Sequence, residues 1–308
     1  MRILLVASFN KGRFAPFVVE QAEALKKQGC EIEFFGLQGK GGKGYLKNLP
    51  KLKSRIKAFR PDVIHAHYGL SGLFANLQRR VPVVTTYHGS DINESKLLHF
   101  SRMAMWLSTW NVFVSKKTLA LAKPKKRYVL LPCGIDFTDL QLTEKDEARR
   151  RMHLEAGKCY VLFAGAFDNE VKNAALARKA VEEVHNLKVE LLELKGYSRE
   201  EVTLMMCAAD VFLMTSFTEG SPQVIKEAMA CGCPIVSVDV GDVRERTEGM
   251  EGCFVAATRD PKELAALLQK TFAFKGKTKG RERLMEDGLD NCMVAQRLVE
   301  IYKTVCRK

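Results

Sequence analysis

Short apolar runs alternate with amphipathic helical segments along the chain, and this rhythm constrains the fold more than any other feature. The first half contains six such runs, at Arg2–Ala7, Cys30–Gly36, Asp62–His67, Val81–His88, Asn111–Ser115 and Tyr128–Cys133. Between the first two, the segment Phe14–Lys27 places its apolar residues on one helical face. Strands that alternate with helices in this way form a parallel sheet covered by helices.

The same alternation restarts in the second half of the chain. After the polar stretch Thr138–Arg151, apolar runs recur at Tyr160–Gly165, Lys188–Leu194, Asp210–Ser216, Pro234–Asp239 and Cys253–Ala256. The sequence therefore predicts an α/β protein with two Rossmann-like domains, residues 1–137 and 138–290. A last helical segment, 291–308, is expected to cross back onto the first domain. Because ligands of parallel sheets bind at the carboxyl ends of the strands, we expect the two sheets to face each other across a cleft.

Length and composition support this division into two domains. A chain of 308 residues with 46% hydrophobic residues can bury two cores. The opening Met-Arg-Ile-Leu-Leu-Val-Ala is too short an apolar run for a signal peptide, and no apolar stretch reaches membrane-spanning length, so we expect a cytoplasmic protein. Nine scattered cysteines favour reduced thiols, and Cys231 and Cys233 lack the second pair that a zinc site needs, so no metal site is expected.

The excess positive charge lies entirely in the first half of the chain. Residues 1–140 contain 23 Lys and Arg against 9 Asp and Glu, whereas residues 141–308 contain 26 against 27. A basic face on one domain favours a localised anionic partner. Lipid headgroups, a phosphorylated acceptor and nucleic acid all remain open at this point.

The range 40–60 concentrates this charge, with eight basic residues and no acid. Its leucines, Ile56 and Phe59 recur at helical spacing, which is typical either of a helix that covers the domain with a solvated outer face or of one that docks on anionic lipid at the inner membrane face. The overlapping glycine-rich segment Gly39–Gly44 is expected to be a mobile surface loop. Further along, Leu97–Val114 is rich in Met and Trp and is expected to be buried core or the border of an acceptor groove.

The segment Ser216–Gly232 has the features of a phosphate-binding junction between a strand and a helix. Ser221 can cap a helix over 222–231, and Pro222 suits its first turn. Backbone N–H groups and the positive end of the helix dipole meet at such a point and bind phosphate oxygens. Gly220 lets the backbone come close to the ligand.

Two glutamates of this junction, Glu219 and Glu227, suit the other groups of a nucleotide sugar. Glu219 lies in the loop, where it would face the sugar. Glu227 lies inside the helix, where it could accept hydrogen bonds from ribose hydroxyls, as an acidic residue does in dinucleotide-binding folds. A first-turn acid and a solvated helix residue are the simpler interpretations of two such glutamates, and only the neighbouring residues favour the nucleotide-sugar site.

Titratable residues also follow two predicted strands of the first half. The segment Asp62–Gly69 ends a strand with His65 and His67 on one face. No third ligand is obvious, so we interpret them as strand-end histidines facing the cleft rather than as a metal pair. After the next apolar run, His88 could hydrogen-bond the transferred sugar and Asp91 could reach the acceptor.

The stretch Ala209–Glu245 resembles the donor-binding signature of family 4 retaining glycosyltransferases. The segments 62–69 and 85–91 are similar to the amino-terminal pattern of this family, and Leu131–Asp136 resembles its interdomain sequence, with Cys133 where Asn is usual. The resemblance implies a GT-B enzyme that moves a sugar from a nucleotide-diphosphate donor, bound by the second domain, to an acceptor hydroxyl in polysaccharide or glycolipid synthesis. It implies no cofactor, no metal and no nucleic acid, and the sequence has no Asp-x-Asp motif.

The resemblance also assigns roles to individual residues. The family grips the donor diphosphate with a Gly-Arg pair and a later Lys; Gly165 and Lys172 match, but Ala166 replaces the arginine. A charged hydrogen bond contributes about 1.5–3 kcal/mol, so this change implies weaker binding, a compensating cation or a different donor. Lys195 and Tyr197 would frame the base. The implied donor-binding set is Gly165, Lys172, Lys195, Tyr197, Gly220, Ser221, Pro222, Gln223 and Glu227; the catalytic set is Glu219, His88 and Asp91; and the acceptor side is Gly12 and His67.

Three other functions remain open. A nucleotide-sugar epimerase or hydrolase of the same fold would convert the donor without an acceptor. A non-catalytic protein, suggested by Ala166, would bind nucleotide sugar without turnover. A nucleic-acid-binding protein, suggested by the charge alone, would show salt-dependent binding to nucleic acid and none to nucleotide sugars.

Overall fold

The computed structural model describes residues 1–39, 41–125, 127–138 and 140–307. The chain forms two compact units: the first contains Met1–Gly134 and the C-terminal segment from Leu289, and the second contains Ile135–Gly288. The sequence placed the two boundaries after residues 137 and 290. The chain in fact changes unit after two glycines, Gly134 and Gly288.

The first unit is built on a six-stranded parallel sheet in the order β2-β1-β3-β4-β5-β6. Its strands are β1 (Arg2–Ser8), β2 (Glu31–Leu37), β3 (Val63–His67), β4 (Val83–Tyr87), β5 (Trp110–Phe113) and β6 (Tyr128–Leu130). The central strands β3 and β4 are buried along their whole length, so they carry little period-two alternation. The parallel sheet predicted for the first half is confirmed.

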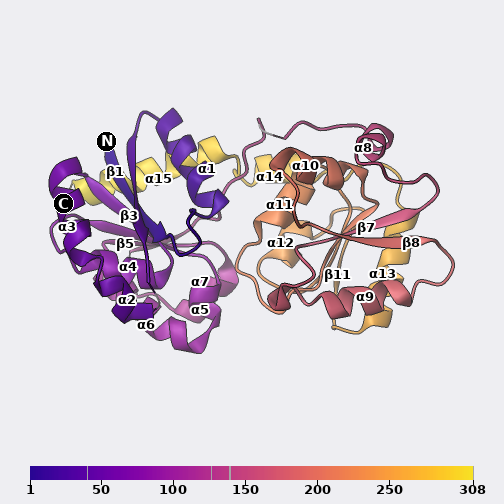
Figure 1. The fold of residues 1–308 in the computed structure, drawn as a ribbon, viewed down its shortest axis with the longest axis horizontal. Helices are drawn as coiled ribbons and strands as arrows, with labels where there is room; N and C mark the ends of the chain where they lie inside the picture. Colours follow the sequence, from indigo (N-terminus) through magenta and orange to yellow (C-terminus); the bar gives the residue numbers. More distant parts are fainter. Residues whose placement is uncertain (40, 126, 139, 308) are drawn as a thin grey trace. The chain divides into compact units, whose positions relative to one another are not determined.

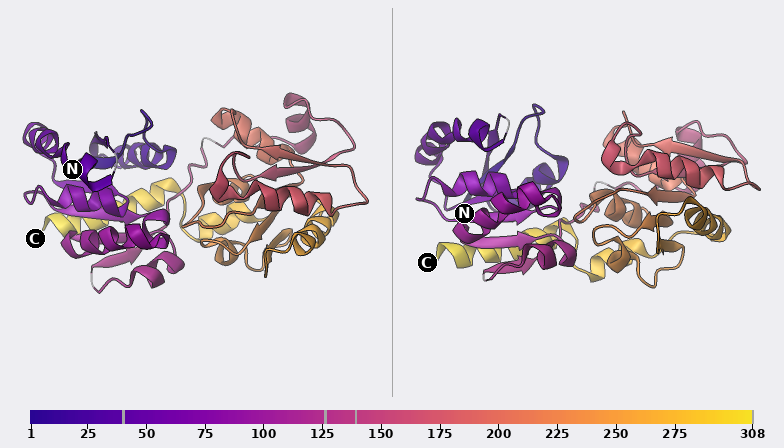
Figure 2. Two further views of the ribbon diagram at one scale, coloured as in Figure 1. Left: turned by 60° about the horizontal axis from the view of Figure 1, so that its bottom comes forward. Right: turned by 90° about the horizontal axis from the view of Figure 1, so that it is seen from below.

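Helices cover this sheet, and the last helix of the chain is one of them. They are α1 (Pro16–Lys27), α2 (Gly41–Leu46), α3 (Leu49–Phe59), α4 (Gly69–Asn76), α5 (Ser90–Asn93), α6 (Ser95–Leu107), α7 (Lys116–Ala122) and α15 (Asn291–Cys306). α15 contacts α1 and β3, and its Tyr302 is fully buried. In each view this yellow helix runs alongside the indigo and purple elements of the first unit (Figures 1 and 2). The predicted return of the C-terminal helix is confirmed.

The basic range 40–60 forms two short helices, α2 and α3, rather than one. Leu52, Ile56 and Phe59 of α3 are buried in the core beside the sheet, which leaves its lysines on the outer face. This is the domain-covering arrangement, since the apolar face of α3 is used within the unit. The expectation of a mobile loop at Gly39–Gly44 is wrong from Gly41 onward, because these residues belong to α2. Lys40 lies outside the described residues.

The expectation of buried core at Leu97–Val114 is wrong for the outer face of α6. This helix packs against α4 through small residues: a Cβ on Gly69 of α4 would meet Ser101 of α6, and Ala104 is fully buried. The close approach turns the long apolar side chains outward, and Trp106 is 83% exposed. The apolar content of the segment predicted burial, but the small residues decide which face is buried.

The second unit has a five-stranded parallel sheet in the order β11-β10-β9-β7-β8. Its strands are β7 (Cys159–Phe163), β8 (Val189–Glu193), β9 (Val211–Met214), β10 (Ile235–Val238) and β11 (Cys253–Ala256). Its helices are α8 (Lys145–Arg151), η1 (Glu170–Lys172), α9 (Ala174–Glu182), α10 (Arg199–Ala208), α11 (Gln223–Ala230), α12 (Val243–Thr247), α13 (Pro261–Ala273) and α14 (Gly280–Glu286). All five predicted strands of the second half are present.

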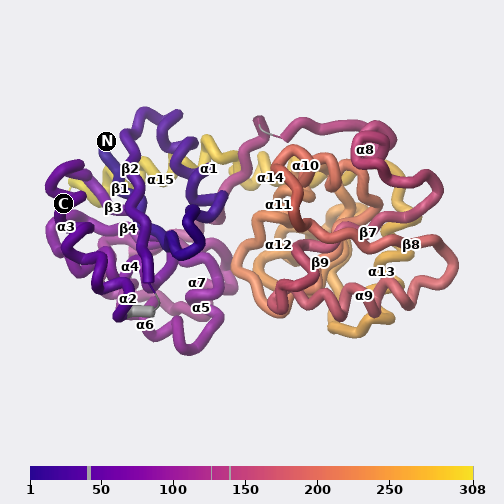
Figure 3. The backbone as a smooth tube through the Cα atoms, viewed as in Figure 1, coloured from indigo at the N-terminus to yellow at the C-terminus, as the bar shows by residue number. Residues whose placement is uncertain are grey.

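Parallel strands bring their carboxyl ends to one edge of each sheet, which gathers the predicted functional residues. In the first unit, the loops that leave this edge follow β1, β3 and β4, and they contain Gly12, Tyr68 and His88. In the second unit it is followed by the loops after β7, β9 and β10. The path of the chain through both sheets can be followed in Figure 3.

Candidate functional site

The junction between β9 and α11 is the centre of the site in the second unit. α11 begins at Gln223 with Pro222 as its N-cap, and no side chain caps it. The predicted cap by Ser221 is wrong, because the Ser221 hydroxyl donates instead to Asp242 Oδ2 at 2.9 Å. The N-cap residue, Pro222, has no side-chain oxygen to offer the first turn of α11, and a helix start of this kind suits an anionic ligand.

A buried network holds this junction in place. Asp242 also accepts from Arg246 Nε at 3.1 Å, and Arg246 donates to Asp287 at 2.6 Å. Next to Asp242, Gly241 has a φ of +54°, and a Cβ there would lie 2.8 Å from the carbonyl oxygen of Gly220. Gly241 is thus needed for the close packing of the loop after β10 against the backbone of Gly220. The predicted approach of a ligand to Gly220 remains a prediction.

Lys172 and Glu219, predicted separately for diphosphate and sugar, form an ion pair. Lys172 Nζ lies 2.7 Å from Glu219 Oε1, and both side chains are more than four-fifths buried. A Cβ on Gly165 would lie 3.0 Å from Lys172 Cγ, so the lysine stem passes over this glycine. The structure therefore brings three predicted residues from the loops after β7 and β9 to one point.

The loop that carries Glu219 is fixed from behind by residues that the sequence did not single out. Thr215 donates to the carbonyl oxygens of Lys172 and Asn173. Arg259 donates to the carbonyl oxygens of Thr215 and Ser216 at 3.1 and 2.8 Å and also to that of Phe217. The Arg259 guanidinium thus anchors the loop before Glu219 through its backbone carbonyls. Nothing in the local sequence around Arg259 indicated this role.

Glu227, the predicted ribose ligand, faces a cation. Its Oε1 lies 3.4 Å from Arg199 of α10, and 14% of its side chain is exposed. Burial raises the pKa of Glu227, and the charges of Arg199 and Lys226 oppose this rise. Arg199 was missed because it lies outside the motif, at the start of a helix that the fold places beside α11.

Lys226 is a second residue that the sequence interpretation missed. It is fully buried, and its Nζ donates to Gln223 Oε1 at 2.6 Å. Because Gln223 is the first residue of α11, the ammonium group reaches back to the amino-terminal end of the helix. Lysine is almost never fully buried, so its presence here requires a specific partner. Lys226 lies four residues after Pro222 and next to Ile225, and both of these residues are buried. This spacing places Lys226 on the inner face of the helix and could have indicated its burial.

The loop after β7, where Ala166 lies, contains a cation on an aromatic ring. The Arg178 guanidinium carbon lies 4.1 Å from the centre of the Phe167 ring, and Phe167 N donates to Glu193 at 2.6 Å. Lys195 forms an exposed ion pair with Asp168, which raises the pKa of Lys195. Lys195 is thus directed to this loop in the unliganded protein.

Tyr197 is partly exposed in the turn between β8 and α10. Arg199, two residues later, pairs with Glu227, so this turn lies beside the predicted ribose ligand. The predicted contacts of Lys195 and Tyr197 with the base stay predictions.

Three histidines form a row at the carboxyl edge of the first sheet. The rings of His65 and His67 stack with centres 4.6 Å apart, those of His67 and His88 with centres 5.2 Å apart, and His67 Nδ1 lies 3.0 Å from His88 Nε2. At the inner end, His65 hydrogen-bonds Tyr302 of α15 at 2.5 Å and Thr86 at 2.7 Å. Burial lowers the pKa of His67 to about 3 and holds that of His65 well below its usual value. The inner part of this histidine row is neutral at physiological pH.

His88 lies at the outer, half-buried end of the row. The Phe17 and Tyr68 rings lie 4.6 and 4.7 Å from its ring, and Cys133 Sγ lies 3.9 Å from its Nδ1. Cys133, which stands where the family usually has Asn, is therefore in contact with this residue. Gly12 lies in the exposed loop after β1 with a φ of +70°.

Asp91 does not have the role that the sequence suggested. It is 3% exposed, and its carboxylate accepts from the backbone N–H groups of Gly69, His88 and Gly89 at 2.8 to 3.0 Å. Burial raises its pKa to about 6, against these hydrogen bonds. The predicted reach of Asp91 to an acceptor is wrong because both oxygens are held inside the unit. Asp91 instead positions the backbone of His88 and the start of α4.

Two family models match the chain on either side of the interdomain segment. Residues 15–139 match the model described as Glycosyltransferase Family 4, and residues 152–273 match the one described as Glycosyl transferases group 1. The chain belongs to the family 4 glycosyltransferases. The first match contains the histidine row, and the second contains Lys172, Glu219 and Glu227.

Curated relatives of the chain have names that assign them to polysaccharide synthesis. The chain is 28% identical to the putative teichuronic acid biosynthesis glycosyltransferase TuaC of Bacillus subtilis over 59% of this chain and 54% of the relative. It is 26% identical to the amylovoran biosynthesis glycosyltransferase AmsK of Erwinia amylovora over 69% of this chain and 61% of the relative. The chain thus spans a little over half of the length of these relatives.

Solved structures share the GT-B fold. Sucrose-phosphate synthase from Thermosynechococcus elongatus superposes with a TM-score of 0.81 at 17% identity, covering 99% of both chains. Anabaena HepE in complex with UDP and glucose gives 0.76 at 18% identity, covering 98% of this chain and 99% of that one. Within the described residues, no group of three His, Cys, Asp or Glu side chains is arranged to hold a metal ion, and no helix has the length and apolarity of a bilayer span.

Proposed function

We propose that this protein transfers a sugar from a nucleotide-diphosphate donor to an acceptor hydroxyl, with retention at the anomeric carbon, in the synthesis of a polysaccharide or glycolipid. The observation that carries the proposal is the Lys172–Glu219 pair beside the amino-terminal end of α11. A diphosphate binds to a cation, and sugar hydroxyls donate to a carboxylate. The pair offers both groups at one place. In the unliganded protein they neutralise each other.

Donor binding would exchange the partner of Lys172. The diphosphate takes the ammonium group, and Glu219 becomes available to accept hydrogen bonds from sugar hydroxyls. Lys226 at the amino-terminal end of α11 supplies a second cation, which compensates for the missing arginine at Ala166. Together with the first-turn amides of α11, these lysines stabilise the negative charge that develops on the departing diphosphate, without a metal ion.

The ribose would bind at Glu227. Its carboxylate is oriented by Arg199 and accepts hydrogen bonds from the ribose hydroxyls, as the acidic residue does in dinucleotide-binding folds. In the first unit, His88 would contact the transferred sugar, since it is the outermost and most accessible member of the histidine row. Its neutral neighbour His67 orients the His88 ring.

The donor nucleotide to test first is uridine diphosphate, because HepE, which shares the fold, was solved with UDP and with UDP-glucose. We would measure thermal stabilisation of the protein by UDP, GDP, ADP and their sugar conjugates. A selective upward shift with one nucleotide is expected, and Lys172→Ala should abolish it. Lys158→Ala removes an equally ion-paired lysine at the opposite end of β7 and should retain it. A shift that persists unchanged in Lys172→Ala would refute the donor site.

A nucleotide-sugar epimerase is the second candidate. The UDP-GlcNAc 2-epimerase of Methanocaldococcus jannaschii shares the fold, with a TM-score of 0.65 at 14% identity. Incubation with UDP-GlcNAc and no acceptor separates the two functions. Accumulation of an isomeric nucleotide sugar would favour the epimerase, and an unchanged donor that is consumed only when acceptor is added would favour the transferase.

A further inference from the structure

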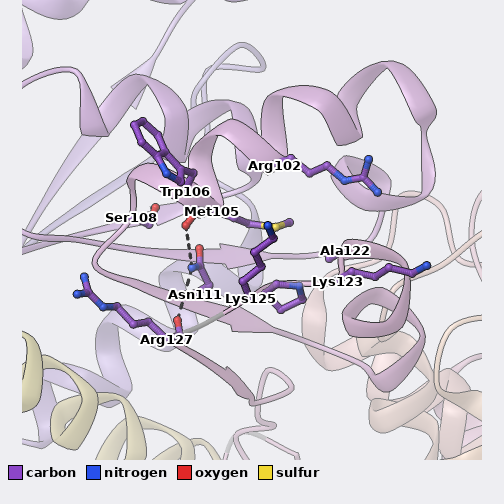
Figure 4. A pocket seen from close by; sticks show the side chains of 10 residues that line it. Arg102, Met105, Trp106, Ser108, Asn111, Ala122, Lys123, Lys125 and Arg127 are labelled. Carbon is purple, nitrogen blue, oxygen red and sulfur yellow. Dashed lines mark hydrogen bonds between the residues drawn. The ribbon is translucent and has the colours of Figure 1, made fainter.

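The first unit has a cavity far from the predicted sugar site. It has a volume of about 590 Å³ and is lined by Arg102, Met105, Trp106, Lys123, Lys125 and Arg127, among others. These residues come from α6 and from the segment between α7 and β6 (Figure 4). Because β4, β5 and β6 are parallel, the amino-terminal ends of β5 and β6 lie at the sheet edge opposite to His88. We call Arg102, Trp106, Lys123, Lys125 and Arg127 the basic–aromatic surface.

This surface carries positive charge that the protein does not neutralise. The sequence from 95 to 135 contains eight Lys and Arg residues and no Asp or Glu. Within the described part of the chain, Arg102, Lys123, Lys125 and Arg127 form no ion pair with an acidic side chain. Four cations around one cavity repel one another, so an anionic partner would stabilise them.

The surface also exposes apolar side chains next to these charges. Trp106 is 83% exposed, and Phe100 and Met103, which precede it at intervals of three on α6, are exposed to 39% and 44%. A tryptophan so exposed in a soluble unit is unfavourable unless something covers it. Tryptophan beside lysine and arginine is the combination enriched where proteins meet the headgroup region of a membrane.

The polar groups at the floor of the cavity do not suit a neutral sugar. Asn111 donates to the carbonyl oxygen of Met105 and accepts from Tyr87, and Ser108 bonds Asn76 and Thr85. These groups are occupied within the unit, which leaves cations and apolar surface to meet a ligand. Phosphate esters attached to hydrocarbon match this chemistry better than sugar hydroxyls do.

We propose that the basic–aromatic surface docks the protein on anionic phospholipid. The four cations contact lipid phosphates, and the Trp106 ring enters the headgroup region. α3 is also basic, but its apolar side chains are buried in the core, so it presents charge without an exposed aromatic ring. The proposal therefore places membrane contact on α6 and the α7–β6 segment rather than on 40–60. It does not depend on the proposed enzymatic activity.

The test compares two variants with the same change of charge. Sedimentation with vesicles of phosphatidylcholine and phosphatidylglycerol is measured for Arg102→Glu/Lys123→Glu/Lys125→Glu/Arg127→Glu and for Lys47→Glu/Lys51→Glu/Lys53→Glu/Lys57→Glu. Each cation near an anionic surface contributes about fivefold in affinity, so we expect a loss of about 100-fold or more in the first variant and a much smaller loss in the second. An equal loss in both, or a larger loss in the second, would overturn the proposal.

Fluorescence tests the position of Trp106 directly. The chain has two tryptophans, and Trp110→Phe leaves Trp106 alone; Trp110 Nε1 is buried with no hydrogen-bond partner among the described residues, so the change removes no hydrogen bond. On anionic vesicles the emission should shift to shorter wavelength and be quenched by brominated lipid tails. Bound protein whose emission does not change, or binding to soluble DNA or polyglutamate as tight as to vesicles, would exclude docking through this surface.

Discussion

The two units use opposite electrostatic designs at the same edge of similar sheets. In the second unit, functional side chains are charged and paired with each other, as Lys172 with Glu219 and Arg199 with Glu227. In the first unit, the histidine row is stacked, buried and neutral. Paired charges can exchange partners when an anionic ligand arrives, whereas neutral imidazoles offer hydrogen bonds without attracting counterions. We propose on this basis that the paired charges of the second unit bind the nucleotide diphosphate, and that the neutral histidine row of the first unit, through His88, adds hydrogen bonds to the sugar that Glu219 also contacts.

The largest expected effect is on Glu219. Glu219→Ala removes the group that we propose contacts the sugar and should lower the rate of donor cleavage by about 100-fold or more, because electrostatic contacts of this kind are strongest in the transition state. Release of nucleoside diphosphate measures the rate. Glu200→Ala breaks an exposed pair with Arg151 and should leave the rate unchanged. Equal rates for Glu219→Ala and wild type would show that Glu219 has no role in the reaction.

Lys226 tests whether a buried cation serves ligand binding rather than folding. Lys226→Met keeps the volume and removes the charge, so affinity for the nucleoside diphosphate should fall by about 10- to 100-fold. Thermal stability without ligand should stay equal or rise, because a buried charge is costly to desolvate. Calorimetric titration measures the affinity, with Lys158→Met as a control. A large loss of stability with unchanged affinity would make Lys226 structural.

The pH dependence of nucleotide binding sharpens the role of Glu227. As the proposed ribose ligand, its carboxyl group accepts stronger hydrogen bonds when it is ionised, and burial raises its pKa. Affinity should therefore fall on acidification at a higher pH than an ordinary glutamate would give, and Glu227→Gln should remove this step. Titrations at several pH values measure it. A wild-type profile that is flat down to pH 4 would contradict the assignment.

The smallest expected effect is on the acid stability of the first unit. His67 has a pKa of about 3 when folded and about 6.5 when unfolded, so the unfolded chain binds the proton first. The contribution of His67 to stability is complete above pH 6.5 and is lost progressively as the pH falls below this value, with a loss of about 0.8 kcal/mol at pH 6.

Urea unfolding of wild type and His67→Gln measures this contribution. Asp91 acts in the opposite direction, since its pKa is raised to about 6, so the difference between variant and wild type is the relevant quantity. This difference should shrink as the pH falls. A difference that does not vary with pH would show that the pKa of His67 is not lowered in the folded protein.

The strands and the β9–α11 junction were predictable because buried parallel strands and helix starts leave local patterns in the sequence. The hydrogen-bond and ion-pair partners of individual side chains were not predictable. Ser221 suited a cap by type and position, but Asp242, distant in sequence, binds its hydroxyl. Arg199 and Arg259 have ordinary surroundings in the sequence and gain their roles only when α10 and the loop after β11 pack beside the site. Trp106 shows the same limit, since its exposure follows from the small residues on the other face of α6.

The return of α15 to the first unit has a consequence for synthesis on the ribosome. The second unit contains only a continuous stretch, Ile135–Gly288, so it can fold as soon as that stretch has emerged. The first sheet must wait, because α15, which covers β3 and gives His65 its Tyr302 partner, is translated only after the whole second unit. The nascent first unit therefore exposes apolar surface for the time needed to translate the whole second unit, roughly 10 to 30 seconds, and is the part of the chain that most needs a chaperone.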